Sequence, residues 1–170
     1  NEWLVARKKA PFPEYLPNQF TDYVKPLVLL ALNTGMRRGE LFNLVIEDVE
    51  LNFGTRQEGR IVVRGAGAKS GNSRNIPLTN EARALLKDWI RITQPTGLLF
   101  PSPVTGERLD NITSAWGRLI KSAGIKKFRF HDLRHTFASK LAMRGVDLYT
   151  IKEFLGHASI DTTQRYAHLG

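Results

Sequence analysis

Glycine residues divide much of the chain into short apolar segments that have the spacing of helices. Gly35, Gly124, Gly145 and Gly156 each follow such a segment, and glycine most easily adopts the left-handed conformation with which many helices end. Within most of these segments the apolar residues recur three and four positions apart, which is the repeat of a helix with one buried face. A chain divided in this way is expected to fold as a set of short packed helices.

The same pattern gives the expected limits of seven helical segments. The first is apolar on most sides, which indicates a buried helix, and its Pro26 is tolerated only near the first turn. Asn80, Asp110 and Asp147 are expected to cap three of the others, because their side-chain oxygens can accept a hydrogen bond from a free backbone N–H. The expected helices cover 21–33, 38–44, 80–92, 110–124, 131–145, 147–156 and 159–168.

One stretch between the second and third helices has the character of β-structure. Val49 and Leu51 indicate one strand, 61–63 a second and 75–78 a third. The small residues between the last two strands predict a hairpin with Lys69 at its tip. The predicted fold class is therefore mainly α with a small three-stranded antiparallel sheet.

The charge of the chain favours a polyanionic partner. The 170 residues include 25 Lys and Arg against 16 Asp and Glu, for a net charge of +9. A domain this basic is biased towards nucleic acid or an acidic surface, although the same charge can serve solubility alone. No apolar run approaches the roughly 18 residues of a membrane span, so no membrane partner is expected. Residues 1–19 hold three prolines and are expected to be a linker remnant, leaving 20–170 as one domain.

Metal-dependent and nucleotide-dependent chemistry find little support in the sequence. The chain has no cysteine, which excludes thiolate ligands. His131 and His135 are four positions apart, as two zinc ligands can be, but Arg134 lies beside them and would repel a metal ion. The carboxylates are scattered and no Gly-Lys-Ser/Thr phosphate loop is present. No metal and no other cofactor are expected.

A different set of polar residues fits phosphoryl transfer to a tyrosine. Arginine side chains match the two non-bridging phosphate oxygens, and a lysine can protonate the leaving oxygen. Histidine can hydrogen-bond the phosphate or accept the proton of the phenol. Each residue also has an ordinary structural explanation, so only the combination indicates catalysis. The set is Arg37, Lys69, His131, Arg134, His157 and Tyr166.

Four sequence segments carry a resemblance to a known family. They are TGMRRGEL (34–41), Lys69 before Ile-Pro-Leu (76–78), HDLRHTFA (131–138), and LGHA (155–158) followed by QRY (164–166). These segments, in this order, resemble the motifs of the tyrosine recombinases, the phage integrase family. The resemblance runs from about residue 21 to the end of the chain, and it implies the catalytic-domain fold of the DNA breaking–rejoining enzymes. It also implies that an N-terminal DNA-clamping domain and a C-terminal tail are missing from this chain.

The resemblance implies a role for each residue of the set. Tyr166 is expected to be the nucleophile that forms a 3′-phosphotyrosyl bond. Arg37 and Arg134 are expected to hold the scissile phosphate, and Lys69 to act as general acid for the 5′-hydroxyl.

The resemblance assigns the remaining residues to supporting contacts. His131 is expected to act as base or phosphate ligand, and His157 as a further phosphate contact. Glu40 is expected to support Arg37, and His135 to be structural. Neither metal nor ATP is required, because the covalent bond conserves the energy of the phosphodiester.

The partners follow from the same resemblance and from the charge. The chain is expected to bind double-stranded DNA, with Lys126, Lys127 and Arg129 facing it, and the full-length protein to form a homotetramer on two duplexes. The expected location is the cytoplasm of a bacterium, the gene being bacterial or phage-encoded. Two alternatives stay open: relaxation of DNA in the manner of a type IB topoisomerase, and a catalytically silent DNA-binding module on the same fold.

Overall fold

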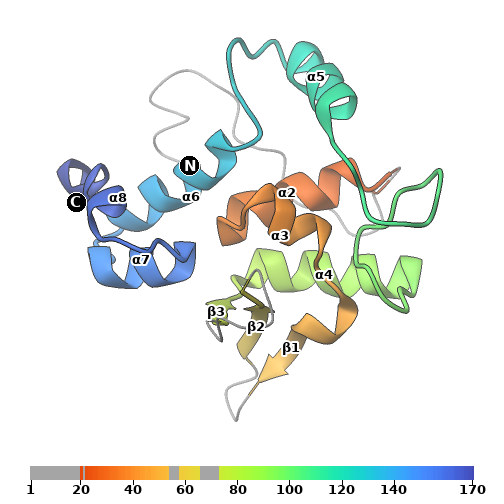
Figure 1. Ribbon diagram of the computed structural model, residues 1–170, viewed down its shortest axis with the longest axis horizontal. Helices are drawn as coiled ribbons and strands as arrows, with labels where there is room; N and C mark the ends of the chain where they lie inside the picture. Colours follow the sequence, from red (N-terminus) through yellow and green to blue (C-terminus); the bar gives the residue numbers. More distant parts are fainter. Residues whose placement is uncertain (1–19, 21, 54–57, 66–72) are drawn as a thin grey trace.

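The computed structural model describes residue 20 and residues 22–53, 58–65 and 73–170, and it is mainly helical with one small sheet, as predicted (Figure 1). The expected linker at 1–19 and the tip of the hairpin with Lys69 lie outside the described residues. The helices are α2 (Val24–Thr34), α3 (Arg38–Phe42), α4 (Asn80–Thr93), α5 (Thr113–Ser122), α6 (Asp132–Met143), α7 (Leu148–Leu155) and α8 (Asp161–Gln164). Two short 3₁₀ helices cover Ile46–Asp48 and Ala167–Leu169.

The three strands form one antiparallel sheet in chain order. They are β1 (Val49–Phe53), β2 (Glu58–Val63) and β3 (Arg74–Pro77). Ile61 in the central strand lies opposite Val49 on one side and Ile76 on the other. Ile61 and Ile76 are fully buried, so one face of the sheet contributes to the main hydrophobic core.

Helix α2 is the centre of the fold, where α4 and α6 pack against it. Leu27 and Leu30 are fully buried, and Pro26 lies in the first turn, where its missing N–H costs no hydrogen bond. The helix ends at Gly35, whose φ is +63°. A Cβ atom there would collide with Phe137 of α6. The end of α2 is therefore pressed closely against α6, which positions the segment 35–40 beside that helix.

A second, smaller core lies between α6, α7 and the last turn of the chain. It contains Phe137, Ile151, Leu155 and Tyr166. Asp147 caps α7 as predicted, since its side chain accepts a hydrogen bond from the N–H of Thr150. Figure 1 shows α6, α7 and α8 together at one end of the molecule, with β3 close to α7. The last turn of the chain thus packs against α6 and α7 through Tyr166.

Two predicted caps are wrong. Helix α4 is capped by Thr79, not by Asn80, because the hydroxyl of Thr79 accepts from the N–H of Ala82. Asp110 does not cap α5. That helix begins only at residue 113, and Asn111 accepts from the first backbone N–H instead. In both cases a neighbouring polar side chain with the same capping ability is better placed.

Two predicted helices also differ from the structure in other respects. The segment 159–168 is not continuous, because α8 ends at Gln164 and Tyr166 lies between it and the final 3₁₀ turn. The apolar face of α5 was expected to point inward, yet none of its residues is fully buried. Leu119 of this helix is 36% exposed. Helix α5 therefore contributes less to the core than its pattern predicts.

Candidate active site

Three consecutive backbone carbonyls at the C-terminal end of α7 each accept a hydrogen bond from a different arginine. Arg74 donates from Nε to the carbonyl of residue 154 at 2.8 Å, Arg134 from Nη2 to that of residue 155 at 2.6 Å, and Arg37 from Nη2 to that of residue 156 at 2.9 Å. The end of a helix presents free carbonyls and a partial negative charge that attract cations. Arginines from β3, α6 and the start of α3 are thereby brought to one place.

Arg37 and Arg74 share a carboxylate as well as this helix end. The Glu40 carboxylate accepts from Nη1 and Nη2 of Arg74, both at 2.8 Å. It also accepts from the backbone N–H of Arg37 at 2.7 Å and from its Nη1 at 3.1 Å. Burial raises the pKa of Glu40, but these hydrogen bonds and the two positive charges outweigh it and hold the pKa below its usual value. Glu40 is therefore ionised and holds both the backbone and the side chain of Arg37.

Arg134 is the most deeply buried of the three arginines, at 3% exposure. Besides its bond to α7, its Nη1 donates to the carbonyl of Gly35 at 2.8 Å. Burial, followed by repulsion from Arg37, lowers the pKa of Arg134 to about 10, so it stays charged at neutral pH. A guanidinium has five N–H donors, and these two bonds leave others for a ligand as far as the described residues go. The guanidinium groups of Arg37 and Arg134 can together donate hydrogen bonds to an anion that has at least two oxygens.

His157 directly follows the helix end that holds the arginines. Its Nδ1 lies 2.9 Å from the hydroxyl of Thr163, which is fully buried. Burial and then the positive charges of Arg134 and Arg37 lower the pKa of His157 to about 4. The ring is therefore neutral at pH 7. An anion bound at the arginines would offset part of this positive field, and the neutral imidazole can donate one hydrogen bond.

Tyr166 is 5% exposed and its phenol oxygen lies 2.5 Å from Nδ1 of His135. His135 was expected to be structural, but the structure places it directly against the hydroxyl of the predicted nucleophile. Burial raises the pKa of Tyr166, an effect that the positive charges of Arg165 and Arg134 oppose. Burial lowers the pKa of His135, and the neighbouring His131 lowers it further. A neutral phenol thus meets a neutral imidazole.

His131 and His135 are stacked edge to face one helical turn apart, with ring centres separated by 5.1 Å. Burial, together with the positive charges of Arg134 and Arg129, lowers the pKa of His131. The positive charge of Arg37 also lowers the pKa of His131. Five of the six predicted catalytic residues are therefore gathered around the ends of α6 and α7. The sixth, Lys69, lies outside the described residues.

Arg74 was not predicted as a site residue. Its place in the sequence, within a short strand after a polar hairpin, gives no local sign of a contact with α3 or α7. The only available signal was its position five residues after Lys69. Its role depends on contacts between residues that are 34 and 80 positions apart.

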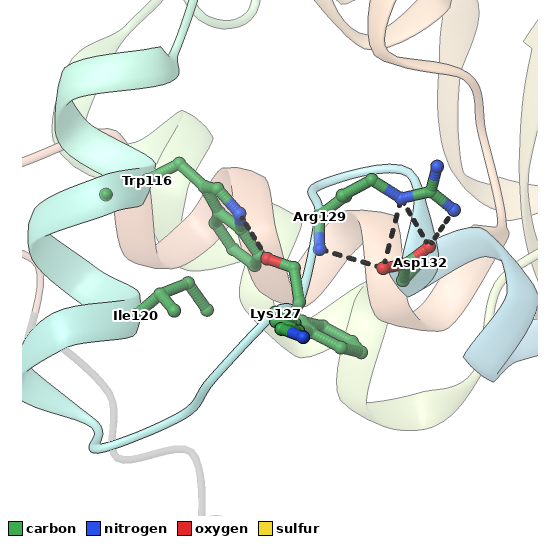
Figure 2. Close-up of a pocket in the computed structure, with 7 residues that line it drawn as sticks. Trp116, Ile120, Lys127, Arg129 and Asp132 are labelled. Carbon is green, nitrogen blue, oxygen red and sulfur yellow. Dashed lines mark hydrogen bonds and ion pairs between the residues drawn. The ribbon is translucent and has the colours of Figure 1, made fainter.

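The basic connector before α6 lines a separate open cleft of about 570 Å³ (Figure 2). Trp116 and Ile120 of α5 form its apolar side, and the connector supplies Lys127 and Arg129. Figure 2 shows Arg129 turned towards Asp132, to which it donates at 2.9 Å. Lys126, Lys127 and Arg129 are all exposed, so a polyanion could reach them. Lys127 has a φ of +53°, which is uncommon for a residue with a side chain.

The described part of the chain contains no cluster of three or more His, Asp or Glu side chains that could hold a metal ion. None of its helices is long and apolar enough to span a bilayer.

Comparison with known proteins gives a consistent result. The family model described as "Phage integrase family" matches residues 12–170. The tyrosine recombinase XerA of Pyrococcus furiosus is 39% identical over 190 residues, covering 99% of this chain and 63% of XerA. The integrase of Salmonella phage P22 is 34% identical over 166 residues, covering 91% of this chain and 41% of that protein.

A solved structure agrees with the sequence comparisons. The site-specific recombinase XerH, in a crystal structure of a post-cleavage complex with a palindromic difH substrate, superposes with a TM-score of 0.70. It is 31% identical, and the match covers 85% of this chain and 41% of that one. The chain thus spans about half the length of the relatives that it matches.

Proposed function

The chain belongs to the phage integrase family, and on this basis we propose that it is the catalytic domain of a tyrosine-type site-specific DNA recombinase. The observation that carries the proposal is the convergence of Arg37, Arg134, His157 and the Tyr166–His135 pair around the ends of α6 and α7. Phosphoryl transfer to a tyrosine requires a phenol as nucleophile and fixed positive charges that stabilise the phosphate oxygens, and Tyr166, Arg37 and Arg134 can provide these groups. In this proposal residues 1–19 link the domain to the rest of a longer protein.

The proposed reaction begins with binding of the scissile phosphate of DNA. Arg37 and Arg134 donate to the non-bridging oxygens, which gain negative charge in the transition state, and His157 adds a hydrogen bond. The phenol oxygen of Tyr166 attacks phosphorus, a P–O bond forms, and the bond to the 5′-oxygen breaks. Lys69 supplies the proton that the leaving oxygen takes up. The product is a 3′-phosphotyrosyl bond and a free 5′-hydroxyl.

The proton of the phenol must leave as Tyr166 attacks. His135 Nδ1 is already hydrogen-bonded to this hydroxyl, which supports His135 as the acceptor. His131 is then assigned to the phosphate. Rejoining is the reverse reaction, in which a 5′-hydroxyl attacks the phosphotyrosyl bond. It consumes no ATP, since each step exchanges one phosphate ester for another.

The proposed partner is double-stranded DNA, in keeping with the +9 charge and with the DNA complex of XerH. Lys126, Lys127 and Arg129 are proposed to contact the DNA backbone. The full-length protein is proposed to act as a homotetramer on two duplexes in the cytoplasm of a bacterium.

The test is covalent capture on a nicked duplex, from which the short 5′ fragment diffuses away and leaves the protein attached. The chain should form a denaturation-resistant adduct, and Tyr166→Phe should form none. Tyr149→Phe is the matched control, because Tyr149 of α7 is 69% exposed and outside the site. Equal capture by the chain and by Tyr166→Phe would refute the assignment of the nucleophile. Efficient relaxation of a supercoiled plasmid that lacks any preferred site would favour the topoisomerase alternative.

A further inference from the structure

Arg74 connects three parts of the fold that are far apart in the sequence. Its Nη1 and Nη2 donate to the two oxygens of Glu40 in α3, and its Nε donates to the carbonyl of Phe154 in α7. The side chain is only 17% exposed. One guanidinium thus holds both a carboxylate and a helix end, and its rigid planar fork fixes the directions of these bonds.

Gly156 is packed against the same guanidinium. A Cβ atom at this position would lie 2.9 Å from Nη1 and 3.0 Å from Cζ of Arg74, and the φ of Gly156 is +65°. Gly156 also provides the carbonyl that binds Arg37, and His157 follows it directly. The flat face of Arg74 thus lies against the turn that carries one proposed phosphate contact and anchors another.

A second arginine–glutamate pair, in the sheet, provides a comparison for the pair of Arg74 and Glu40. Arg60 of β2 donates to Glu50 of β1 through Nε at 2.8 Å and Nη2 at 3.1 Å. This pair has the same two-pronged form, but it joins neighbouring strands and is more exposed, at 27% and 35%. Glu40 differs because it also binds the backbone and the side chain of Arg37.

We propose that Arg74 is a positioning residue for DNA cleavage: it fixes Glu40, and through it Arg37, and it holds the Gly156 turn that carries His157. The inference rests on the proposed function, because it assigns Arg37 and His157 to the scissile phosphate. Arg74 itself does not contact the phosphate in this assignment. Since it follows the hairpin of Lys69 in the chain, it also ties the strand that leaves that hairpin to the rest of the site.

The test compares single-turnover cleavage of the nicked duplex at saturating DNA. Arg74→Gln should slow cleavage at least about tenfold, because small displacements of catalytic groups cost that much or more. Its Kd for intact duplex should stay within about twofold of the parent, since only the alignment of the site changes. Arg74→Lys keeps the charge but loses the fork, and should also be slow. The control Arg60→Gln breaks the comparable pair and should cleave at the parent rate.

The decisive measurement is made in the background of Arg37→Ala. Because Arg74 acts partly through Arg37, adding Arg74→Gln there should slow cleavage by a clearly smaller factor than in the parent chain, and the factor that remains measures the route through the Gly156 turn and His157. Fully multiplicative effects would overturn the proposal, as would a parent rate in Arg74→Gln or an equal loss in Arg60→Gln. Should Arg74→Gln fail to fold, Arg74→Lys provides the same comparison. Failure of the parent chain to form any adduct would refute the proposed function instead.

Discussion

The phenol oxygen of Tyr166, which is buried, lies 2.5 Å from Nδ1 of His135, which is half-buried. Burial disfavours the charged form of each, so the phenol keeps its proton. In the imidazole tautomer that leaves Nδ1 without a proton, this nitrogen accepts the hydrogen bond of the phenol. Tyr166 is thereby held against α6. The contact packs the C-terminal segment against α6, and in the proposed reaction it places the proton of the phenol next to its acceptor.

This contact predicts a measurable coupling energy in the free energy of unfolding. His135→Leu leaves the buried phenol without a partner and should cost about 1–3 kcal/mol. Tyr166→Phe removes the hydroxyl, and in that background His135→Leu should destabilise the protein by about 1 kcal/mol less than it does in the parent chain. Urea unfolding of the parent chain, the two single variants and the double variant measures this difference. Strictly additive losses would show that the two residues do not interact.

Arg37 and Arg134, the two proposed phosphate ligands, should have similar effects on the cleavage rate but different effects on the free energy of unfolding. Arg37→Ala and Arg134→Ala should each raise the cleavage barrier by on the order of 3 kcal/mol, as loss of one preorganised donor does. Arg134→Ala should also destabilise the fold, because it leaves the buried carbonyls of Gly35 and Leu155 without a donor.

Arg37 is 45% exposed, so its replacement should change the free energy of unfolding by no more than about 1 kcal/mol. Single-turnover cleavage and thermal unfolding of both variants provide the comparison. Normal cleavage by either variant would contradict its assignment to the phosphate.

The histidine beside the arginines should make the folded protein less stable in acid. The pKa of His157 is about 4 in the folded protein because of burial and nearby cations, against about 6.5 in an unfolded chain. Between these values the unfolded chain binds a proton that the folded protein does not. The free energy of unfolding should therefore fall as pH falls from about 6.5 to 4, with no contribution from this group above that range.

The variant His157→Asn should make the pH dependence of unfolding shallower over this range. His168→Asn is the control, because His168 is an exposed histidine in the last 3₁₀ turn. Urea unfolding at several pH values measures the slope. An identical change of slope in both variants would show that the arginine cluster is not the cause.

The exposed connector before α6 should contribute to the salt dependence of DNA binding. If Lys126 and Lys127 each neutralise a phosphate, replacing both by Ala should reduce the slope of log K against log salt by about 2. The control Lys87→Ala removes an exposed cation from α4 and should leave the slope nearly unchanged. Fluorescence anisotropy with labelled duplex at several salt concentrations gives the slopes. An unaltered slope in the double variant would remove the connector from the DNA interface.

Local sequence was sufficient for those elements whose ends depend on a single residue. Gly35 and Gly156 end their helices with positive φ, and Asp147 caps α7, all as predicted. These features depend on backbone preferences that a residue carries with it wherever it occurs. The cap at Asn80 was misplaced because Thr79 competes for the same role, and the burial of α5 was overestimated because periodicity does not reveal how much of a face finds a partner.

The sequence by itself determined the helical fold class and the three strands, and it supplied the candidate residues for the proposed chemistry, because spacing and side-chain type are local properties. Only the tertiary structure decided that His135 meets Tyr166, and that Arg37, Arg74 and Arg134 bind three successive carbonyls at the C-terminal end of α7. Arg74 and Glu40 are 34 positions apart, and Arg134 and Gly35 are 99 apart. Such contacts are set by how α2, β3, α6 and α7 pack together, and no local pattern in the sequence encodes that packing.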